Sequence, residues 1–296
     1  AIAPPTASPP PPISRSGLDG HPLVAGVAEP VRIAVVIDNA PEARPQSGIA
    51  DAPLVIEMPV EGGRTRFLAV FPADATVAEV GPVRSARPYA IALARMLRAA
   101  LVHVGGSPAA LNDLRAHRND LVQVDEYYDP PFRRVTFRRA PFNVYTSMTK
   151  LAAFLDARGL MDALRGAAPV VLFAADVVAT PSHEGTPVSF SIAYADPVRW
   201  TYDAAHGVHV RSQGDRPHRD ADGKIVQATN VVMLRVRARV LDDVGRLALT
   251  LPTDFAPGTA IVYTGEKRTR GSWAVGSDGV GHGLRGCGHR RRCRGE

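Results

Sequence analysis

EMPVEGGRTRFLAVF (57–71), GPVRSARPYAIALARML (81–97) and LVHVGGSP (101–108) are the segments that decide the fold. In them, apolar runs long enough for a strand or a helix alternate with short loops that contain arginines, carboxylates and glycines. The runs 53–59 and 65–71 are predicted strands. Gly62 and Gly63 between them are expected to supply the positive φ angles of a tight hairpin.

Two predicted helices follow these polar loops. Tyr89, Leu93 and Leu97 recur at helical spacing, which predicts an amphipathic helix over 85–98. Ser107 followed by proline is typical of a helix start, so a second helix is expected to begin after the strand LVHV. LVQVDE (121–126) is the next predicted strand, and the resulting β-α-β order predicts parallel pairing.

The sequence predicts an α/β (α+β) fold with two structured parts. Residues 29–170, which include the apolar strand RIAVVID (32–38) and a third helix over 146–164, form an N-terminal mixed sheet with flanking helices. Residues 171–276 contain short apolar runs such as VVLFAA and NVVMLRVRARV, so we expect a smaller, β-rich and mostly antiparallel domain. The proline-rich residues 1–28 are expected to be a disordered stalk, and residues 277–296 a basic disordered tail.

Composition narrows the class of protein. The chain has 296 residues, of which 45% are hydrophobic, so it can bury a large core. Its net charge is +6, but five arginines and only two acidic residues lie in the region 277–296, so the body is mildly basic and we expect no nucleic-acid partner. Arg95 and Arg98 interrupt the longest apolar run, which is therefore no membrane span.

Cys287 and Cys293 are the only cysteines. A body without thiols excludes a disulfide scaffold and a thiol nucleophile, and it suits an exported protein. His282 and His289 accompany the cysteines, which leaves a zinc site as a minor alternative, but the spacing fits no standard finger and we predict no metal and no cofactor. Because the chain begins with alanine, we expect that a secretion signal has been removed.

Several segments together resemble the YerB-like family of bacterial lipoproteins, a family of unknown function with an N-terminal α/β part and a separate C-terminal part. They span about residues 31–234 and are AVVIDNAPEARPQSGIADAPLVIEMPVEGGRTRFLAVF, GPVRSARPY, VHVGGSP, RAPFNVYTS, VSFSIAY, RPHRDADG and TNVVML. The resemblance implies export, a proline-rich stalk and a lipidated cysteine upstream. We therefore expect membrane attachment only through an anchor that is absent from this sequence. The resemblance implies no activity.

The polar loops predict a pocket for an anionic ligand. Arginine offers two parallel N–H donors to a carboxylate or phosphate, and the first turn of a helix offers free backbone N–H groups. The predicted ligand-binding residues are Asp38, Arg66, Arg84, Ser85, Arg87, Gly105, Gly106, Ser107, Asn143 and Tyr145.

Glu57, Glu61 and His103 support an alternative function. Glycoside hydrolysis uses two carboxylates a few ångströms apart, so the glutamates predict an envelope glycan hydrolase in which His103 assists. Without catalysis, Glu57 neutralises a buried arginine, Glu61 binds turn amides and His103 is a hydrogen-bonded core residue.

Residues 133–145 interleave arginines with Phe137, Phe142 and Tyr145. The pattern suits a grip on single-stranded nucleic acid, or a strand with aromatic side chains inside and arginines outside, and the strand is our prediction. His218 and Asp220 are assigned to a turn rather than to a metal or acid-base site.

The sequence therefore predicts an exported protein of the cell envelope, at the outer face of the cytoplasmic membrane. Its expected partner is an anionic small molecule, a cell-wall fragment or a peptide-like ligand. A structural module that docks another envelope protein is the third alternative.

Overall fold

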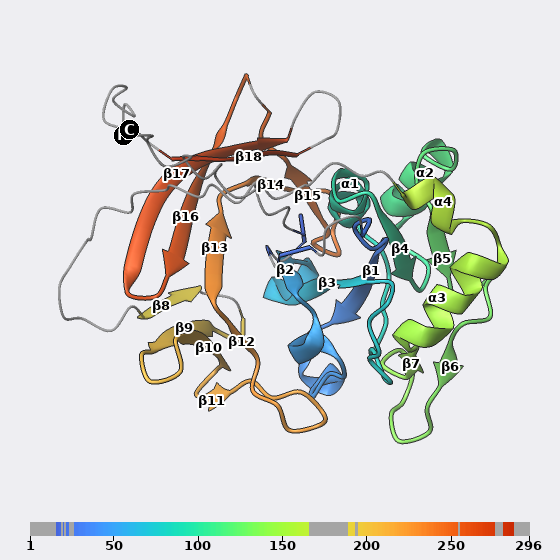
Figure 1. Cartoon of the computed structure of the whole chain (residues 1–296), viewed down its shortest axis with the longest axis horizontal. Helices are drawn as coiled ribbons and strands as arrows, with labels where there is room; N and C mark the ends of the chain where they lie inside the picture. Colours follow the sequence, from blue (N-terminus) through green and yellow to red (C-terminus); the bar gives the residue numbers. More distant parts are fainter. Residues whose placement is uncertain are drawn as a thin grey trace, which may run out of the picture.

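The computed structural model describes residues 16–18, 20, 22–23, 27–165, 189–192, 195–253, 255–275 and 281–286. Its N-terminal half is built on a five-stranded sheet with the order β2-β3-β1-β4-β5 (Figure 1). The strands are β1 (Arg32–Asp38), β2 (Leu54–Pro59), β3 (Thr65–Pro72), β4 (Ala99–His103) and β5 (Gln123–Asp125). β4 is parallel to β1 and β5, whereas β3 is antiparallel to β1 and β2, so the predicted mixed sheet is confirmed.

Helices cover both faces of this sheet. α1 (Pro88–Met96) and α2 (Pro108–Ala116) pack on one face, where their apolar residues join Leu68 and Leu101 in a core. α3 (Met148–Ala157) and α4 (Met161–Leu164) contribute to the core on the other face. Both cores form because successive residues of a strand point to opposite faces.

The helix starts follow from local sequence. The hydroxyl of Ser107 accepts a hydrogen bond from the N–H of Ala110 at 3.2 Å, and Ser147 accepts one from Lys150 at 3.3 Å. α1 has no such side-chain cap and begins at Pro88, whose missing N–H costs nothing in the first turn.

The segment 133–145 is not a single strand, so that prediction is wrong. Arg133–Arg134 form β6 and Val144–Tyr145 form β7, which pair antiparallel on either side of the loop 135–143. Phe137 in this loop is 67% exposed. Pro141 interrupts the strand pattern because proline has no N–H for a β-ladder.

The C-terminal half consists of antiparallel pairs, as predicted. One sheet contains β8 (Ser189–Ile192), β9 (Val198–Asp203), β10 (Val208–Gln213), β11 (Arg216–Pro217) and β12 (Gln227–Ala228). The next contains β13 (Asn230–Leu234), β16 (Gly258–Thr264), β17 (Lys267–Val275) and β18 (Gly281–Gly286). β14 (Arg237–Val240) and β15 (Leu247–Thr250) form a separate hairpin, so the predicted single strand 230–240 is two strands of different sheets.

Two observations correct the expected termini. β18 pairs with β17, although residues 277–296 were expected to be disordered. A glycine-rich strand can extend a sheet through its backbone alone, so it leaves no apolar periodicity in the sequence. Leu18 lies within the expected stalk, yet it is 6% exposed and belongs to the core beneath α1. The predicted strand 170–175 and both cysteines fall outside the described residues.

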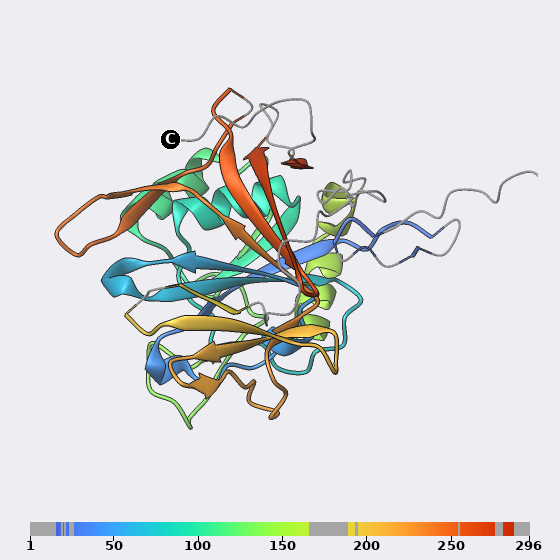
Figure 2. The same cartoon turned by 90° about the vertical axis from the view of Figure 1, so that its left-hand side faces the viewer.

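Figure 2 shows the sheet of β8 to β12 beside β2 and β3, so the two halves of the chain share an interface. Among the described helices, none combines the length and the apolar character that crossing a bilayer requires.

Candidate functional site

Asp38, Arg66 and Arg84 meet at the carboxyl end of β1. Asp38 is the last residue of β1 and lies opposite Arg66 of β3 in the ladder. Its Oδ2 atom accepts hydrogen bonds from Nε of Arg66 and Nε of Arg84, each at 3.1 Å. Three predicted ligand-binding residues therefore lie together, at the sheet edge where open α/β sheets bind ligands.

Arg87 and Glu61 extend this group, and we name the five residues the arginine cluster. Nε and Nη2 of Arg87 both donate to the Glu61 carboxylate, and Nη2 of Arg66 lies 3.8 Å from it. Burial acts to raise the pKa of Glu61, but the hydrogen bond and charge of Arg87 outweigh it, so this pKa lies below its ordinary value. The side chains of Arg66 and Arg87 are only 6% exposed, so the cluster mostly satisfies its own charges.

The GGSP loop lies beside the arginine cluster, but its polar groups are used within the fold. The N–H of Gly105 donates to Oδ1 of Asp125 at 2.8 Å, and Ser107 caps α2. The N–H of Ala86 donates to the carbonyl oxygen of Gly105 at 2.9 Å, and Ala86 forms a parallel bridge with Gly106. The two predicted ligand-binding loops are therefore joined to each other by backbone hydrogen bonds.

Ser85, Asn143 and Tyr145 have separate partners, and only Ser85 contacts the arginine cluster. The carbonyl oxygen of Ser85 accepts a hydrogen bond from Arg66 at 3.2 Å. Asn143 accepts one from an arginine of β6 at 3.3 Å. Tyr145 is buried, and its ring lies 5.8 Å from that of Phe137.

The three residues of the hydrolase alternative have separate partners. Glu57 accepts hydrogen bonds from Arg211, with Nη2 at 2.8 Å and Nε at 3.3 Å. Glu61 is held in the arginine cluster. His103 is fully buried, and its ring nitrogens lie 2.9 Å from a main-chain carbonyl oxygen and 3.1 Å from Oε1 of Gln123.

A second polar network joins the two halves, and no sequence pattern predicted that its members would meet. Nδ1 of His218 accepts a hydrogen bond from Arg211, and its Nε2 lies 2.8 Å from Oε1 of Gln46. Burial, followed by the charges of two nearby arginines, lowers the pKa of His218 to about 3. Asp220 accepts a hydrogen bond from the backbone of Ala50 at 3.0 Å. Both residues therefore bind the N-terminal half, and no cluster of metal-ligating side chains occurs within the described ranges.

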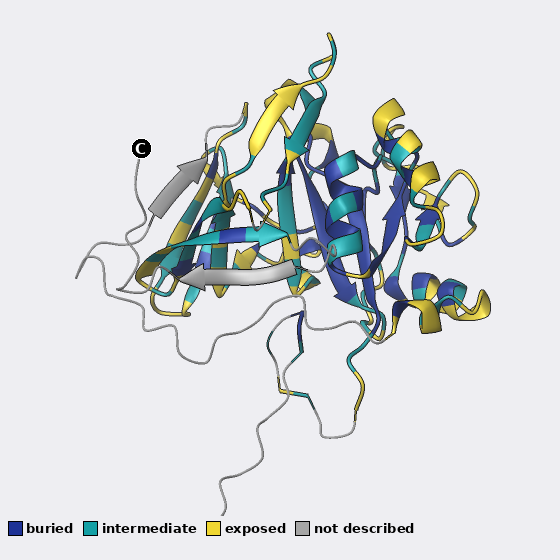
Figure 3. Cartoon of the chain, turned by 90° about the horizontal axis from the view of Figure 1, so that it is seen from above, coloured by how far each residue is buried: buried dark blue, intermediate teal, exposed yellow. Residues whose placement is uncertain are grey.

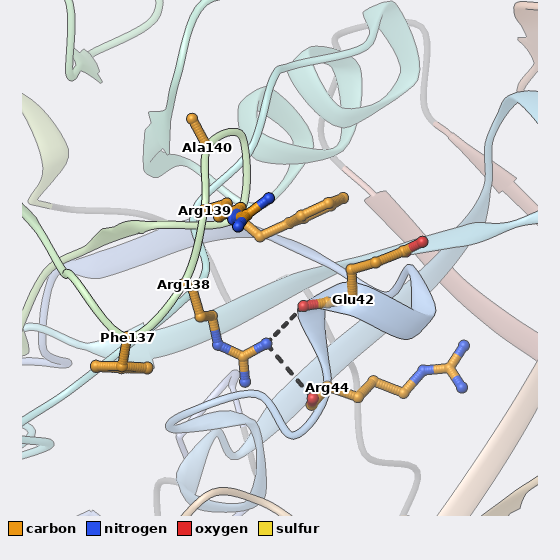
Figure 4. Close-up of a pocket in the computed structure, with 7 residues that line it drawn as sticks. Glu42, Arg44, Phe137, Arg138, Arg139 and Ala140 are labelled. Atoms are coloured by element: carbon orange, nitrogen blue, oxygen red, sulfur yellow. Dashed lines mark hydrogen bonds between the residues drawn. The ribbon is translucent and has the colours of Figure 1, made fainter.

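A groove of 490 Å³ opens beside the arginine cluster, between the 3-10 turn η1 (Pro41–Ala43) and the loop 135–143 (Figure 4). It is lined by Glu42, Arg44, Phe137, Arg138, Arg139, Ala140 and Phe142. Nη1 of Arg138 donates to the carbonyl oxygen of Glu42 at 2.6 Å, and its Nη2 donates to that of Pro45 at 2.5 Å. Arg138 thus holds the two walls together. The Arg84 guanidinium lies 5.4 Å from the centre of the Phe142 ring, which connects the groove to the cluster.

Positive charge in this groove is not fully neutralised. Glu42 lies 3.9 Å from Arg64, and Arg44 is paired with Asp196. Arg138 donates to main-chain oxygens, which carry no full charge. The exposed side chain of Arg139 has no hydrogen-bond or ion-pair partner in the part of the chain that the structure describes.

Sequence reasoning did not place a site in this groove. The usable signal was the alternation of arginine and aromatic residues in 133–145, which we assigned to a strand. The arginine and aromatic residues of the loop 135–143 line the groove because the chain reverses direction there. This reversal depends on the pairing of β6 with β7.

A smaller cavity of 160 Å³ lies on the other side of η1, between the two halves. Its lining residues are Asn39, Pro41, Arg44, Gly63, Arg64, Thr65, Ala195, Asp196 and Gln213. Nδ2 of Asn39 donates to Oγ1 of Thr65 at 2.7 Å and to Oε1 of Gln213 at 3.1 Å. These lining groups therefore bind one another across the interface.

Known proteins match both halves of the chain. The family described as "Protein of unknown function (DUF3048) N-terminal domain" matches residues 20–161, and "Protein of unknown function (DUF3048) C-terminal domain" matches residues 188–281. A Bacillus subtilis (strain 168) protein named "Putative lipoprotein YerB" is 31% identical over 241 residues, which are 80% of this chain and 72% of the relative.

A solved structure has the same architecture. The crystal structure of the YerB protein from Bacillus subtilis superimposes with a TM-score of 0.78 at 27% identity, over 93% of this chain and 91% of that one. Family, relative and fold agree with the resemblance of the sequence segments. The chain therefore belongs to the DUF3048 family, the family of unknown function that contains YerB.

Proposed function

We propose that this protein is held at the outer face of the cell envelope and binds an anionic cell-wall or peptide-like ligand in the groove between η1 and the loop 135–143. The location is supported by the Bacillus subtilis relative, whose name describes a lipoprotein. The ligand class is supported by the charge of the groove.

One observation carries the ligand class, namely the unpartnered guanidinium of Arg139 in a groove that is also lined by Phe137 and Phe142. A guanidinium can bind a carboxylate or phosphate through two parallel hydrogen bonds. Flanking aromatic rings offer apolar area to the rest of the ligand. The arginine cluster supports the groove in this proposal, because Arg84 packs on the ring of Phe142 and holds it in position.

The contacts favour binding over hydrolysis. A general acid must carry a proton at the working pH, and this requires a raised pKa. The pKa of Glu61 is instead lowered by Arg87. Both oxygens of Glu57 accept hydrogen bonds from Arg211, so that carboxylate already has a structural partner.

Calorimetric titration of the full chain with a peptidoglycan stem peptide tests the proposal. Arg139→Gln should weaken binding at least about tenfold, because a charge-assisted hydrogen bond contributes about 1.5 to 3 kcal/mol. Arg199→Gln is the matched control, since Arg199 is an exposed arginine of β9 outside the groove. A phosphate-bearing wall-polymer fragment, used as a second probe, distinguishes a carboxylate ligand from a phosphate ligand. Failure of both probes to bind, or equal binding by Arg139→Gln and the unchanged chain, would contradict the proposal.

A further inference from the structure

The hairpin of β14 and β15 projects from the body of the molecule (Figures 2 and 3). All four residues of β14 are exposed. Near the tip, Val240 and Val244 are each 61% exposed and Leu241 is 38% exposed. Large apolar side chains grouped at the end of a projecting element mark an interaction surface.

The register of the hairpin separates an apolar face from a basic one. Ala238 lies opposite Leu249, and Val240 lies opposite Leu247, so these four side chains share one face. Leu249 packs against the core beneath α1, which anchors this face at its base. Towards the tip, the same face extends beyond the core and reaches solvent.

The opposite face carries exposed arginines. Arg237 and Arg239 are two residues apart in β14 and therefore point to the same side, and Arg235 lies two positions before the first residue of the strand. Their guanidinium groups have no hydrogen-bond or ion-pair partner among the residues described. An anionic partner would supply the negative charges that these arginines lack as partners within the described chain.

The acidic residues of the tip do not cancel this charge. Asp242 is used within the turn, where its carboxylate accepts hydrogen bonds from the backbone N–H of Arg246 at 3.1 Å and from its Nη1 at 2.8 Å. Asp243 is exposed, so the tip is suited to the headgroup region rather than to the hydrocarbon interior.

We propose that the β14–β15 hairpin docks on an anionic membrane surface. Val240, Leu241 and Val244 enter the headgroup boundary. Arg237 and Arg239 lie in β14, between the tip and the body of the molecule, and their long side chains can reach the lipid phosphates.

Sedimentation of the full chain with vesicles tests the proposal. The vesicles contain equal parts of phosphatidylglycerol and phosphatidylcholine, and pure phosphatidylcholine vesicles are the neutral comparison. Each arginine near an anionic surface contributes about fivefold to partitioning, so Arg237→Gln/Arg239→Gln should weaken binding about 25-fold. Val240→Ser/Val244→Ser should weaken binding to the anionic vesicles by a smaller factor, because the arginines remain.

A matched control removes the same charge elsewhere. Arg199 and Arg216 are exposed in β9 and β11, which lie on the opposite side of the molecule from β14 and β15 in Figure 1. Arg199→Gln/Arg216→Gln should retain binding to anionic vesicles. Raising the salt to 1 M shortens the Debye length to about 3 Å and should abolish the binding.

Three outcomes overturn the proposal. One is equal binding to anionic and neutral vesicles. Another is equal loss in the control and hairpin variants, which would show that only net charge matters. The third is absence of vesicle binding, and in that case the exposed valines would be assigned to a protein partner. Unchanged urea unfolding of each variant verifies that the fold is intact. Because the hairpin lies apart from the groove, titration of the groove ligand is an independent measurement.

Discussion

Arg211 of β10 donates two hydrogen bonds to the carboxylate of Glu57 in β2, at 2.8 and 3.3 Å, across the junction of the two halves. Arg211 is only 1% exposed, and its guanidinium lies 5.3 Å from the centre of the Phe67 ring. The same guanidinium donates to His218. One buried cation of the C-terminal half therefore contacts two side chains of the central sheet, Glu57 and Phe67.

Removal of this cation should destabilise the protein strongly. Arg211→Met leaves the Glu57 carboxylate without its partner, and the loss of one member of a buried ion pair costs about 3 to 5 kcal/mol. The measurement is the free energy of unfolding in urea. In the double variant Arg211→Met/Glu57→Gln no charge is left unpaired, so its loss should be smaller than the sum of the single losses. Arg199→Met, at an exposed position, should change stability by less than about 0.5 kcal/mol.

His218 should make stability depend on pH below neutrality. Its pKa is about 3 in the folded protein, whereas an unfolded histidine has a pKa of about 6.5. As the pH falls from about 6.5 to about 3, the unfolded chain takes up the proton first, so the free energy of unfolding decreases over this window. The contribution is complete above pH 6.5. At pH 5 roughly 2 kcal/mol should be lost.

The variant His218→Gln isolates this effect, because glutamine can bond to Arg211 and Gln46 but does not titrate in this range. Urea unfolding at pH 7.5 and at pH 5 should show a smaller decrease for the variant than for the unchanged chain. Parallel decreases in the two proteins would exclude His218 as the source.

The sequence contained enough information to place the arginine cluster. Asp38 is the last residue of one strand, and the GGSP loop follows a second strand. The predicted β-α-β order indicates a parallel sheet, and the carboxyl ends of parallel strands lie at the same sheet edge, so Asp38 and the GGSP loop were expected there together. The charge partners could not be predicted in this way. Glu57 and Arg211 are 154 residues apart in sequence, and no periodic pattern relates two positions in different sheets.

The groove was harder to predict because it depends on a turn. Phe137 and Arg139 lie in a loop that exists only because β6 and β7 are each two residues long. β18 was missed for a different reason. Backbone hydrogen bonds alone can hold a strand in a sheet, so its sequence needs no apolar pattern. Side-chain pattern therefore identified the sheet and its helices, while elements defined by backbone pairing or by distant charges required the structure.

Asp38 should be essential to the arginine cluster. Asp38→Asn retains the shape of the side chain but removes the charge that Arg66 and Arg84 share at 3.1 Å. Three arginines would then face the single carboxylate of Glu61, and we expect a loss of about 3 kcal/mol in the free energy of unfolding. Glu42→Gln is the control, because Glu42 is exposed and lies 3.9 Å from Arg64, and it should cost less than about 1 kcal/mol. Equal effects of the two substitutions would show that the cluster contributes no more than a surface pair.

Gly48 and Gly223 allow backbone strain to be separated from crowding. Their φ angles are +86° and +90°, so alanine at either position adopts the left-handed region at a cost of about 1 kcal/mol. A Cβ atom at Gly223 would meet no atom within 4 Å, whereas at Gly48 it would lie 2.8 Å from the carbonyl oxygen of Glu79.

Gly48→Ala should therefore destabilise the protein at least twice as much as Gly223→Ala in urea unfolding. Gly48 directly precedes η2 (Ile49–Asp51), in which Ala50 donates to Asp220 of the C-terminal half at 3.0 Å. A displacement at Gly48 would be transmitted to that contact, so Asp220→Asn should cost less in the Gly48→Ala background than in the unchanged chain. Equal losses for the two alanine variants would mean that the backbone near Glu79 moves away without cost, and that the interface between the halves does not depend on the position of this turn.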